Sequence, residues 1–173
     1  MRKGKIRTYK DADNGGRMID EKKWRQFGFP RTVADIQGIT IHETGNYEMN
    51  AQELCDWMNT ECKTSQGTHY FVDDTQTVQA MPLDWAVYHT GKGKDWGNEH
   101  TIAIEIVSSY SDEKYLMAED RAVQLIRELM QSHEITSDMV FFHHDFDNKK
   151  HCPNRILDTY GTSKNFVYQK LED

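Results

Sequence analysis

The stretch TIAIEIV at residues 101–107 constrains the fold of this chain more than any other segment. It is an almost unbroken apolar run, and a run of that kind is typical of a strand buried on both faces of a sheet. Such a strand needs other elements packed over both of its faces. The chain is therefore expected to fold in layers around this strand, in which Glu105 is the one carboxylate.

Segments typical of strands and of helices alternate along the rest of the chain. β-branched and aromatic residues indicate strands at 38–42 and 138–143, and two short runs on either side of residues 74–76 indicate a β-hairpin. Helices are indicated by apolar spacing or by a capping residue at three places: 50–62, 117–133 and 162–171. This alternation predicts an α/β fold with a single central mixed β-sheet and helices packed on it.

A chain of 173 residues has the size of one domain. Residues 1–30 are basic and irregular in pattern, so we expect an N-terminal arm there and the folded domain over 31–173. The net charge is −7, although residues 1–31 contain ten of the 21 Lys and Arg residues. The remainder is strongly acidic, and a domain that binds nucleic acid normally presents positive charge. Nucleic acid is therefore not an expected partner.

No apolar run approaches the ~20 residues of a membrane-spanning helix, so membrane insertion is not expected. The basic N-terminus is not followed by the apolar segment of a secretory signal, which predicts a protein made in the cytosol. Three cysteines are an odd number, which argues against a disulfide framework. Cys55 and Cys62 are expected to be small buried residues of the helix at 50–62, whereas Cys152 has polar neighbours. We expect a monomer.

Histidine and cysteine side chains follow the ends of predicted strands. His42 ends the strand at 38–42, His143 ends the strand at 138–143, and Cys152 comes a short loop later. Mixed imidazole and thiolate ligands suggest zinc, and a catalytic zinc ion has three protein ligands and one open position. Each histidine can equally be an ordinary surface or core residue. We assign that ordinary interpretation to three others: His100, His133 and His151.

Glu105 stands out on physical grounds. Ile104 and Ile106 point to one face of the predicted strand, while Ala103, Glu105 and Val107 point to the other. A bare carboxylate is costly to bury, so it must be paired or lie beside a cavity. Glu105 is thus either a residue that reaches solvent or a structural arginine, or a general base with a raised pKa.

Five segments, taken in order, resemble one known family. They lie between about residue 36 and residue 158 and read ITIHETGN, THYFVDDTQTVQAMP, WAVYHTGKG, TIAIEI and HHDFDNKKHCPNRI. Together they resemble the zinc-dependent N-acetylmuramoyl-L-alanine amidases of the type 2 amidase and peptidoglycan-recognition superfamily, and most of all the catalytic domains of phage and prophage endolysins. The resemblance implies an amidase catalytic domain over 31–173 that acts on bacterial peptidoglycan.

The resemblance also implies roles for single residues. Zn²⁺ would be held by His42, His143 and Cys152, Glu105 would be the catalytic carboxylate, and Lys150 would stabilise the oxyanion. Counting eight residues back from the cysteine, as in many relatives, gives His144 as the alternative ligand. The histidine of the H-x-D pattern is His143, which we prefer because the extra residue then falls in a loop.

Substrate contacts are implied for four further residues. His89 would line the cleft, and Trp85 belongs to an aromatic loop that either stacks on substrate or packs in the core. In other branches a tyrosine precedes the hairpin histidine, whereas this chain has Thr68 and His69. The role of that tyrosine is therefore vacant, which is consistent with Glu105 acting as the base.

Two other functions are compatible with the same residues. A peptidoglycan-binding module without catalysis is one, but such relatives typically lack the cysteine ligand, which is present here as Cys152. A zinc peptidase that cleaves the stem peptide is the other, since zinc and a base serve either reaction. In the amidase interpretation the protein stays in the host cytoplasm until it is released to the cell wall.

Overall fold

The apolar run at the centre of the sequence forms the middle strand of a five-stranded sheet in the computed structural model, which describes residues 17–172. The strand order is β4-β3-β6-β2-β7, and β3, β6, β2 and β7 are parallel while β4 is antiparallel to β3. The strands are β2 (Gly38–Glu43), β3 (Tyr70–Val72), β4 (Thr77–Gln79), β6 (Thr101–Ile106) and β7 (Val140–Phe142). The predicted central mixed sheet, with its hairpin, is confirmed.

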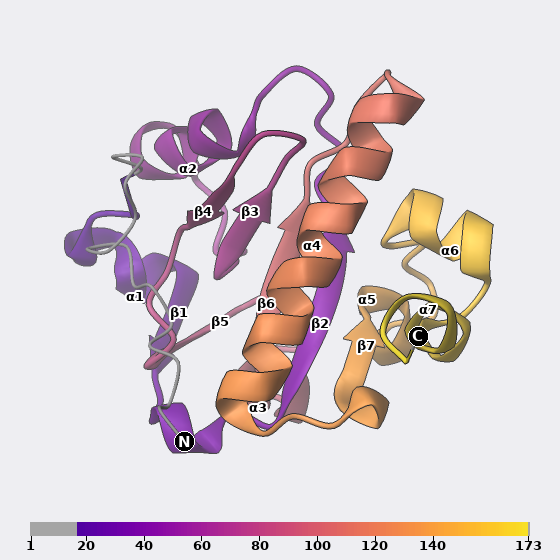
Figure 1. Ribbon diagram of the computed structural model, residues 1–173. Coiled ribbons are helices and arrows are strands. Elements are labelled where there is room, and N and C mark those ends of the chain that lie inside the picture. The colour runs from indigo at the N-terminus through magenta and orange to yellow at the C-terminus, as the bar shows by residue number, and fades with distance from the viewer. Residues whose placement is uncertain (1–16, 173) are drawn as a thin grey trace.

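Helices lie on both faces of this sheet (Figure 1). The long helix α4 crosses one face, and α2 packs on β3 and β4 from the other. The helices are α1 (Trp24–Phe27), α2 (Ala51–Thr60), α3 (Trp96–His100), α4 (Asp112–His133), α5 (His143–Phe146), α6 (Asn154–Tyr160) and α7 (Ser163–Lys170). Short 3-10 turns are η2 (Glu21–Lys23), η3 (Val33–Asp35) and η4 (Ser137–Met139).

Strand β6 divides its side chains between two hydrophobic cores. Ile102, Ile104 and Ile106 are fully buried in the core beneath α4, whereas Ala103 and Val107 belong to the core beneath α2. This alternation follows from the two-residue period of a strand. It confirms the predicted faces and places Glu105 on the α2 side of the sheet.

Capping residues set where the main helices begin. The Asn50 side chain accepts a hydrogen bond from the backbone N–H of Glu53 at the start of α2, and Thr162 caps α7 in the same way. Helix α4 begins at Asp112, five residues earlier than predicted, because Ser111 provides its cap. The first turn of α4 is polar, so apolar spacing alone did not reveal it.

The segment before Pro30 is not the irregular arm that its composition suggested. Residues 17–30 contain η2, α1 and β1 (Gly28–Pro30), and β1 pairs with β5 (Trp85–Val87) in a separate two-stranded sheet. Ile19 and Phe27 are buried in the core beneath α2. These two side chains attach the segment to the domain, which is the physical reason for the difference. The part of the predicted arm at residues 1–16 lies outside the described residues.

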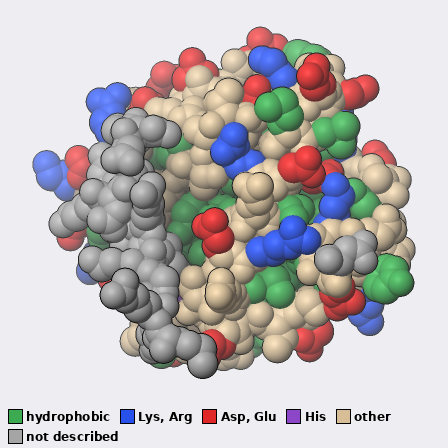
Figure 2. All heavy atoms as spheres, in the orientation of Figure 1, with side chains coloured by type: hydrophobic (Ala, Val, Ile, Leu, Met, Phe, Trp, Pro, Cys, Tyr) green, Lys and Arg blue, Asp and Glu red, His purple; other side chains and the backbone are tan. Residues whose placement is uncertain are grey.

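The cysteines, the helices and the surface charges can be compared with what the sequence predicts. All three cysteines are free thiols, and Cys55 and Cys62 are buried as predicted. Within residues 17–172, no helix combines the length and the apolar character needed to span a bilayer. Where the described residues are visible on the face that carries α4, acidic and basic side chains are interspersed (Figure 2).

Candidate metal centre and active site

A row of polar side chains crosses neighbouring parallel strands. His42 on β2 is in register with Glu105 on β6, and Ile41 is in register with Phe142 on β7. His143 follows Phe142 directly, so it lies beside His42 at the carboxyl end of β7. His42 and Glu105 point to the sheet face opposite α4, since Ile41 belongs to the α4 core. Helix α2 packs on β3 and β4, at the far end of this face from β7.

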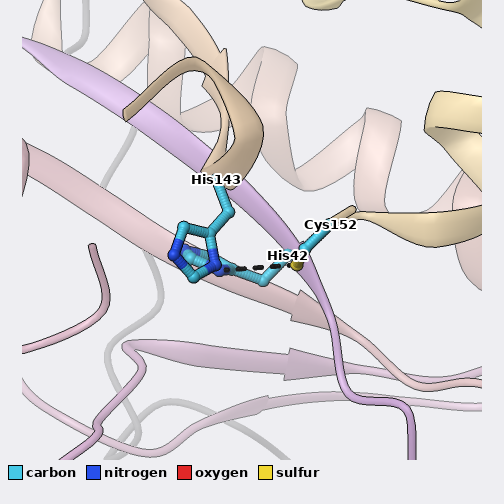
Figure 3. Close-up of side chains that lie close together, drawn as sticks. All are labelled: His42, His143 and Cys152. Atoms are coloured by element: carbon cyan, nitrogen blue, oxygen red, sulfur yellow. Dashed lines mark hydrogen bonds between the residues drawn. The ribbon is translucent and has the colours of Figure 1, made fainter. Parts of the chain in front are cut away.

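The predicted ligands converge at one point (Figure 3). Ligand atoms of His42, His143 and Cys152 all lie within 4.8 Å of one another. Nδ1 of His42 is 3.9 Å from Sγ of Cys152, and the two imidazole rings are 4.7 Å apart between centroids. Bond lengths near 2.1 Å to nitrogen and 2.3 Å to sulfur put the donors of a tetrahedral zinc site about 3.5 Å apart. The three side chains are thus placed to hold one ion.

Backbone hydrogen bonds position the two ligands that follow β7. The carboxylate of Asp145 accepts from the backbone N–H of Phe142 at 2.7 Å and fixes the turn that carries His143. The backbone N–H of His144 donates to the carbonyl of Cys152 at 3.0 Å, which holds the ends of the intervening loop together. Together the two bonds fix the positions of His143 and Cys152 relative to the end of β7.

His144 lies outside the cluster of possible ligands. Its Nδ1 is 2.8 Å from the carbonyl oxygen of Lys150, so this ring is bonded to the loop backbone. Lys150 itself is exposed. Burial has the larger effect on the two neighbouring ligands, lowering the pKa of His143 and raising that of Cys152. The positive charge of Lys150 lowers both pKa values, so its ammonium group lies near the two ligands.

The protonation states of the three ligands suit a cation. Burial lowers the pKa of His42 and of His143, so both imidazoles are neutral and each offers a lone pair. Burial, followed by the charge of Glu105, raises the pKa of Cys152 to about 12. A bound cation reverses that effect, because a coordinating thiol is deprotonated. Nε2 of His143 is buried and has no hydrogen-bond partner among residues 17–172, which also fits a metal ligand.

Glu105 is partly exposed as a residue, but one oxygen of its carboxylate is buried. Its Oε2 is buried and lacks a hydrogen-bond partner within the described part of the chain. Burial, followed by the nearby charge of Glu43, raises the pKa of Glu105 to about 8. A pKa close to the working pH is the property that a general base or acid requires. No arginine of residues 17–172 bonds this buried oxygen, and the residue keeps partial contact with solvent.

His89 is placed behind the cluster and does not line an open cleft. Only 6% of its surface is exposed, and its Nδ1 lies 3.0 Å from Nε2 of His42. Its Nε2 lies 3.2 Å from the hydroxyl oxygen of Thr101. The expected contact with substrate is replaced by a contact with a candidate ligand.

Thr68 and His69 also differ from the expected substrate contacts, because both are buried in the sheet. The Thr68 hydroxyl bonds the carbonyls of Tyr70 and Ala103. Nδ1 of His69 accepts from the backbone N–H of Ala103 at 2.9 Å, and its Nε2 donates to the carbonyl of Trp85. A substrate would reach neither side chain without opening the sheet. Pairing with the β6 backbone accounts for both.

Trp85 packs against the N-terminal segment. Its ring lies 5.6 Å from that of Trp24 between centroids, and its Nε1 donates to the carbonyl of Trp24 at 3.1 Å. Of the two interpretations open for Trp85, core packing is the one that the structure supports. The sequence could not distinguish them, because the partner lies in a segment predicted to be irregular.

Two hollows lie on the surface near the strand ends. One of about 260 Å³ is lined by Val107 and Ser108 with Asp73 and Lys114 among its other walls. The other, of about 440 Å³, is lined by six residues: Ser65, Gln66, Tyr88, Gly91, Gly93 and Lys94. Gly91 and Gly93 have φ angles of 79° and 68°, which favour glycine. The backbone conformation of this loop therefore accounts for glycine at both positions.

Comparison with known proteins agrees with this arrangement. Residues 32–155 match the protein family described as N-acetylmuramoyl-L-alanine amidase. The chain belongs to this family. Among solved structures, that of PlyL is similar with a TM-score of 0.78 and 27% identity, over 88% of this chain and 93% of that one. The catalytic domain of XlyA gives a TM-score of 0.70 and 31% identity, over 81% and 89%. The expected type 2 amidase fold is confirmed.

Curated members of the amidase family include two from Bacillus subtilis (strain 168). The N-acetylmuramoyl-L-alanine amidase CwlA is 37% identical over 121 residues, and the N-acetylmuramoyl-L-alanine amidase XlyA is 34% identical over 129 residues. These matches cover 69% and 73% of this chain but 43% and 42% of the relatives. The chain thus spans less than half the length of these two amidases.

In this amidase-family chain, two residues near the site were not predicted from the sequence, namely Glu43 and Thr101. Glu43 follows His42, and its carboxylate accepts from the Ser108 hydroxyl, the Tyr115 hydroxyl and the backbone N–H of Arg155. Thr101 begins β6 and contacts His89. Two features of the sequence could have indicated them. Glu43 is a carboxylate directly after a histidine at a strand end, and Thr101 is a hydroxyl residue at the start of an apolar strand.

Proposed function

We propose that this chain hydrolyses the amide bond between N-acetylmuramic acid and L-alanine of bacterial peptidoglycan, with zinc held by His42, His143 and Cys152. The proposal is carried by the convergence of these three donors beside the carboxylate of Glu105. The choice of bond follows the curated relatives, which are N-acetylmuramoyl-L-alanine amidases. In this proposal the protein remains in the cytoplasm of the host cell until it is released to the wall.

The proposed roles follow from the chemistry of each group. When bound, zinc acts as a Lewis acid that polarises the oxygen of water or of a carbonyl group. Glu105 accepts a proton from the attacking water and returns it to the amine that leaves when the C–N bond breaks, so it acts first as general base and then as general acid. Lys150 stabilises the negative charge that develops on the carbonyl oxygen, a contribution typically worth about 10²–10³ in rate.

The reaction is tested on purified cell walls. The wild-type protein is expected to release new amino groups at L-alanine without new reducing ends, and Glu105→Gln is expected to lose this activity while keeping its zinc. New amino groups at other positions of the stem peptide would identify a peptidase instead. Retention on walls with no release by the wild-type protein would identify a binding module. Full activity of Glu105→Gln would remove Glu105 from the role of base.

The ligand set is tested by a matched pair of neighbouring histidines. His143→Ala is expected to lose most bound zinc, because one of three ligands is removed. His144→Ala is expected to keep its zinc, because the ring of His144 is bonded to the carbonyl of Lys150. Zinc content measured by atomic emission on dialysed protein separates the two. Loss of zinc in His144→Ala alone would assign the ligand role to His144.

A further inference from the structure

His42 has a defined neighbour at each ring nitrogen. Its Nδ1 faces Sγ of Cys152 at 3.9 Å, and its Nε2 faces Nδ1 of His89 at 3.0 Å. A neutral imidazole has a hydrogen on one nitrogen and a lone pair on the other. His42 can therefore bind an ion on the Cys152 side only in the tautomer that carries its hydrogen on Nε2. The groups behind the ring decide which tautomer is present.

The hydroxyl of Thr101 sets the direction of these hydrogen bonds. Its oxygen is 2.7 Å from the carbonyl oxygen of Gly97, and a carbonyl can only accept, so the single hydroxyl hydrogen is directed there. The same oxygen must then accept from its other two neighbours, Oγ1 of Thr40 at 2.8 Å and Nε2 of His89 at 3.2 Å. His89 therefore carries its hydrogen on Nε2.

The orientation of His89 fixes that of His42. With its hydrogen on Nε2, a neutral His89 ring offers a lone pair at Nδ1, and the contact at 3.0 Å then requires His42 to donate from Nε2. Both rings are buried, and within residues 17–172 neither bonds a carboxylate that would stabilise a second ring hydrogen. The lone pair of His42 is left on Nδ1, on the side of Cys152.

We propose that Thr101 and His89 are positioning residues that hold His42 in the tautomer with its hydrogen on Nε2, so that Nδ1 is available to zinc before the ion arrives. This inference rests on the proposed role of His42 as a zinc ligand. Partners of this kind orient a ligand and remove the competing tautomer, and their loss typically lowers metal affinity about 10- to 100-fold. The chain of bonds runs from the start of β6 through His89 to β2.

The experiment measures tautomers in the metal-free protein and zinc affinity separately. In ¹⁵N-labelled protein, two-bond ¹H–¹⁵N correlation spectra are expected to show His42 with its hydrogen on Nε2 in the wild type and in Thr101→Ser, which keeps the hydroxyl. Thr101→Val is expected to show both tautomers of His42. Its zinc affinity, measured by competition with a chelator, is expected to fall about 10-fold or more.

Thr40→Val is the matched control. It also removes a buried hydroxyl bonded to Thr101, but it lies off the path to His42. Its thermal stability should fall as in Thr101→Val, while the tautomer and the zinc affinity stay at wild-type values. A merely structural role would affect the two valine variants alike. The proposal is overturned if wild-type His42 carries its hydrogen on Nδ1, or if Thr101→Val keeps one tautomer and full zinc affinity.

A second pair of variants applies if Thr101→Val does not fold. His89→Asn retains an acceptor oxygen close to the position of Nδ1, whereas His89→Leu offers none. We expect the zinc affinity of His89→Asn to stay within a few-fold of wild type and that of His89→Leu to fall about 10-fold or more. Equal affinities would overturn the proposal. A wild-type protein that binds no zinc would instead overturn the proposed function, and the tautomer of His42 would still be readable.

Discussion

The carboxyl group of Glu105 lies where its charged form is poorly stabilised. Two neighbouring histidines, His42 and His143, are neutral, and besides burial it is the negative charge of another carboxylate, Glu43, that raises the pKa of Glu105. A site of this composition is electrostatically incomplete without a cation. The same feature that would serve catalysis therefore lowers the stability of the metal-free protein at neutral and higher pH.

This cost predicts a pH dependence of folding. The ordinary pKa of a glutamate side chain is 4.5, and that of Glu105 in the folded protein is about 8, so between these values the folded state binds a proton that the unfolded state has lost. Raising the pH through this window therefore favours unfolding. In metal-free protein, Glu105→Gln should gain stability over wild type as pH rises from 4.5 to 8, with an upper bound of about 5 kcal/mol.

Urea unfolding at several pH values in the presence of a chelator measures this difference. Asp112→Asn, a change on the exposed first turn of α4, serves as a control that should show no such gain. A constant difference between Glu105→Gln and wild type across the window would contradict the raised pKa.

The carboxyl end of β2 connects two sides of the sheet. His42 points toward the candidate metal centre, and the next residue, Glu43, points toward α4 and α6, as neighbours in a strand must. The Glu43 carboxylate accepts from Tyr115 on α4, from Ser108 after β6, and from the backbone N–H of Arg155 on α6. Cys152 lies three residues before Arg155. One strand end therefore carries one ligand and anchors the segment that carries another.

Replacing Glu43 should affect both stability and zinc binding. Glu43→Leu leaves three donors without their acceptor, at about 1–3 kcal/mol for each buried group, so we expect a loss of at least about 3 kcal/mol. Glu43→Gln keeps one acceptor oxygen and should lose about 1 kcal/mol. Zinc affinity should fall in the same order as the Cys152 segment loosens. Calorimetric unfolding and chelator competition provide the two measurements, and equal effects of Leu and Gln would contradict the anchoring role.

At the scale of the whole molecule, the sequence predicted what depends on periodicity and on strong motifs. The central strand at 101–107, the hairpin and the three main helices all appear in the structure. The convergence of His42, His143 and Cys152 followed from their places at strand ends and from the family resemblance. These features are local or repeat along the chain, so they are visible without coordinates.

What the sequence did not reveal depends on contacts between distant segments. Helices α3 and α6 are five and seven residues long, too short to show a helical period. Thr68 and His69 were assigned to the substrate side, but their hydrogen bonds to the β6 backbone exist only once the strands are aligned. Likewise, the family resemblance implied a place in the cleft for His89, whereas its contact with His42, 47 positions away in the sequence, is visible only in the folded chain.

The segment at 17–30 allows the extent of the folded unit to be tested. Phe27 is fully buried in the core beneath α2, whereas Phe29 is half-buried, against Tyr88 and beneath the ammonium group of Lys94. If this segment is part of the cooperative domain, Phe27→Ala should cost about 3–5 kcal/mol, as for other buried phenylalanines. Phe29→Ala removes less buried area and should cost about 1 kcal/mol.

Urea unfolding followed by fluorescence and by circular dichroism measures both losses of stability, and the two probes should report a single coincident transition. Equal small losses, or a separate early transition in Phe27→Ala, would show that the segment folds independently of the sheet.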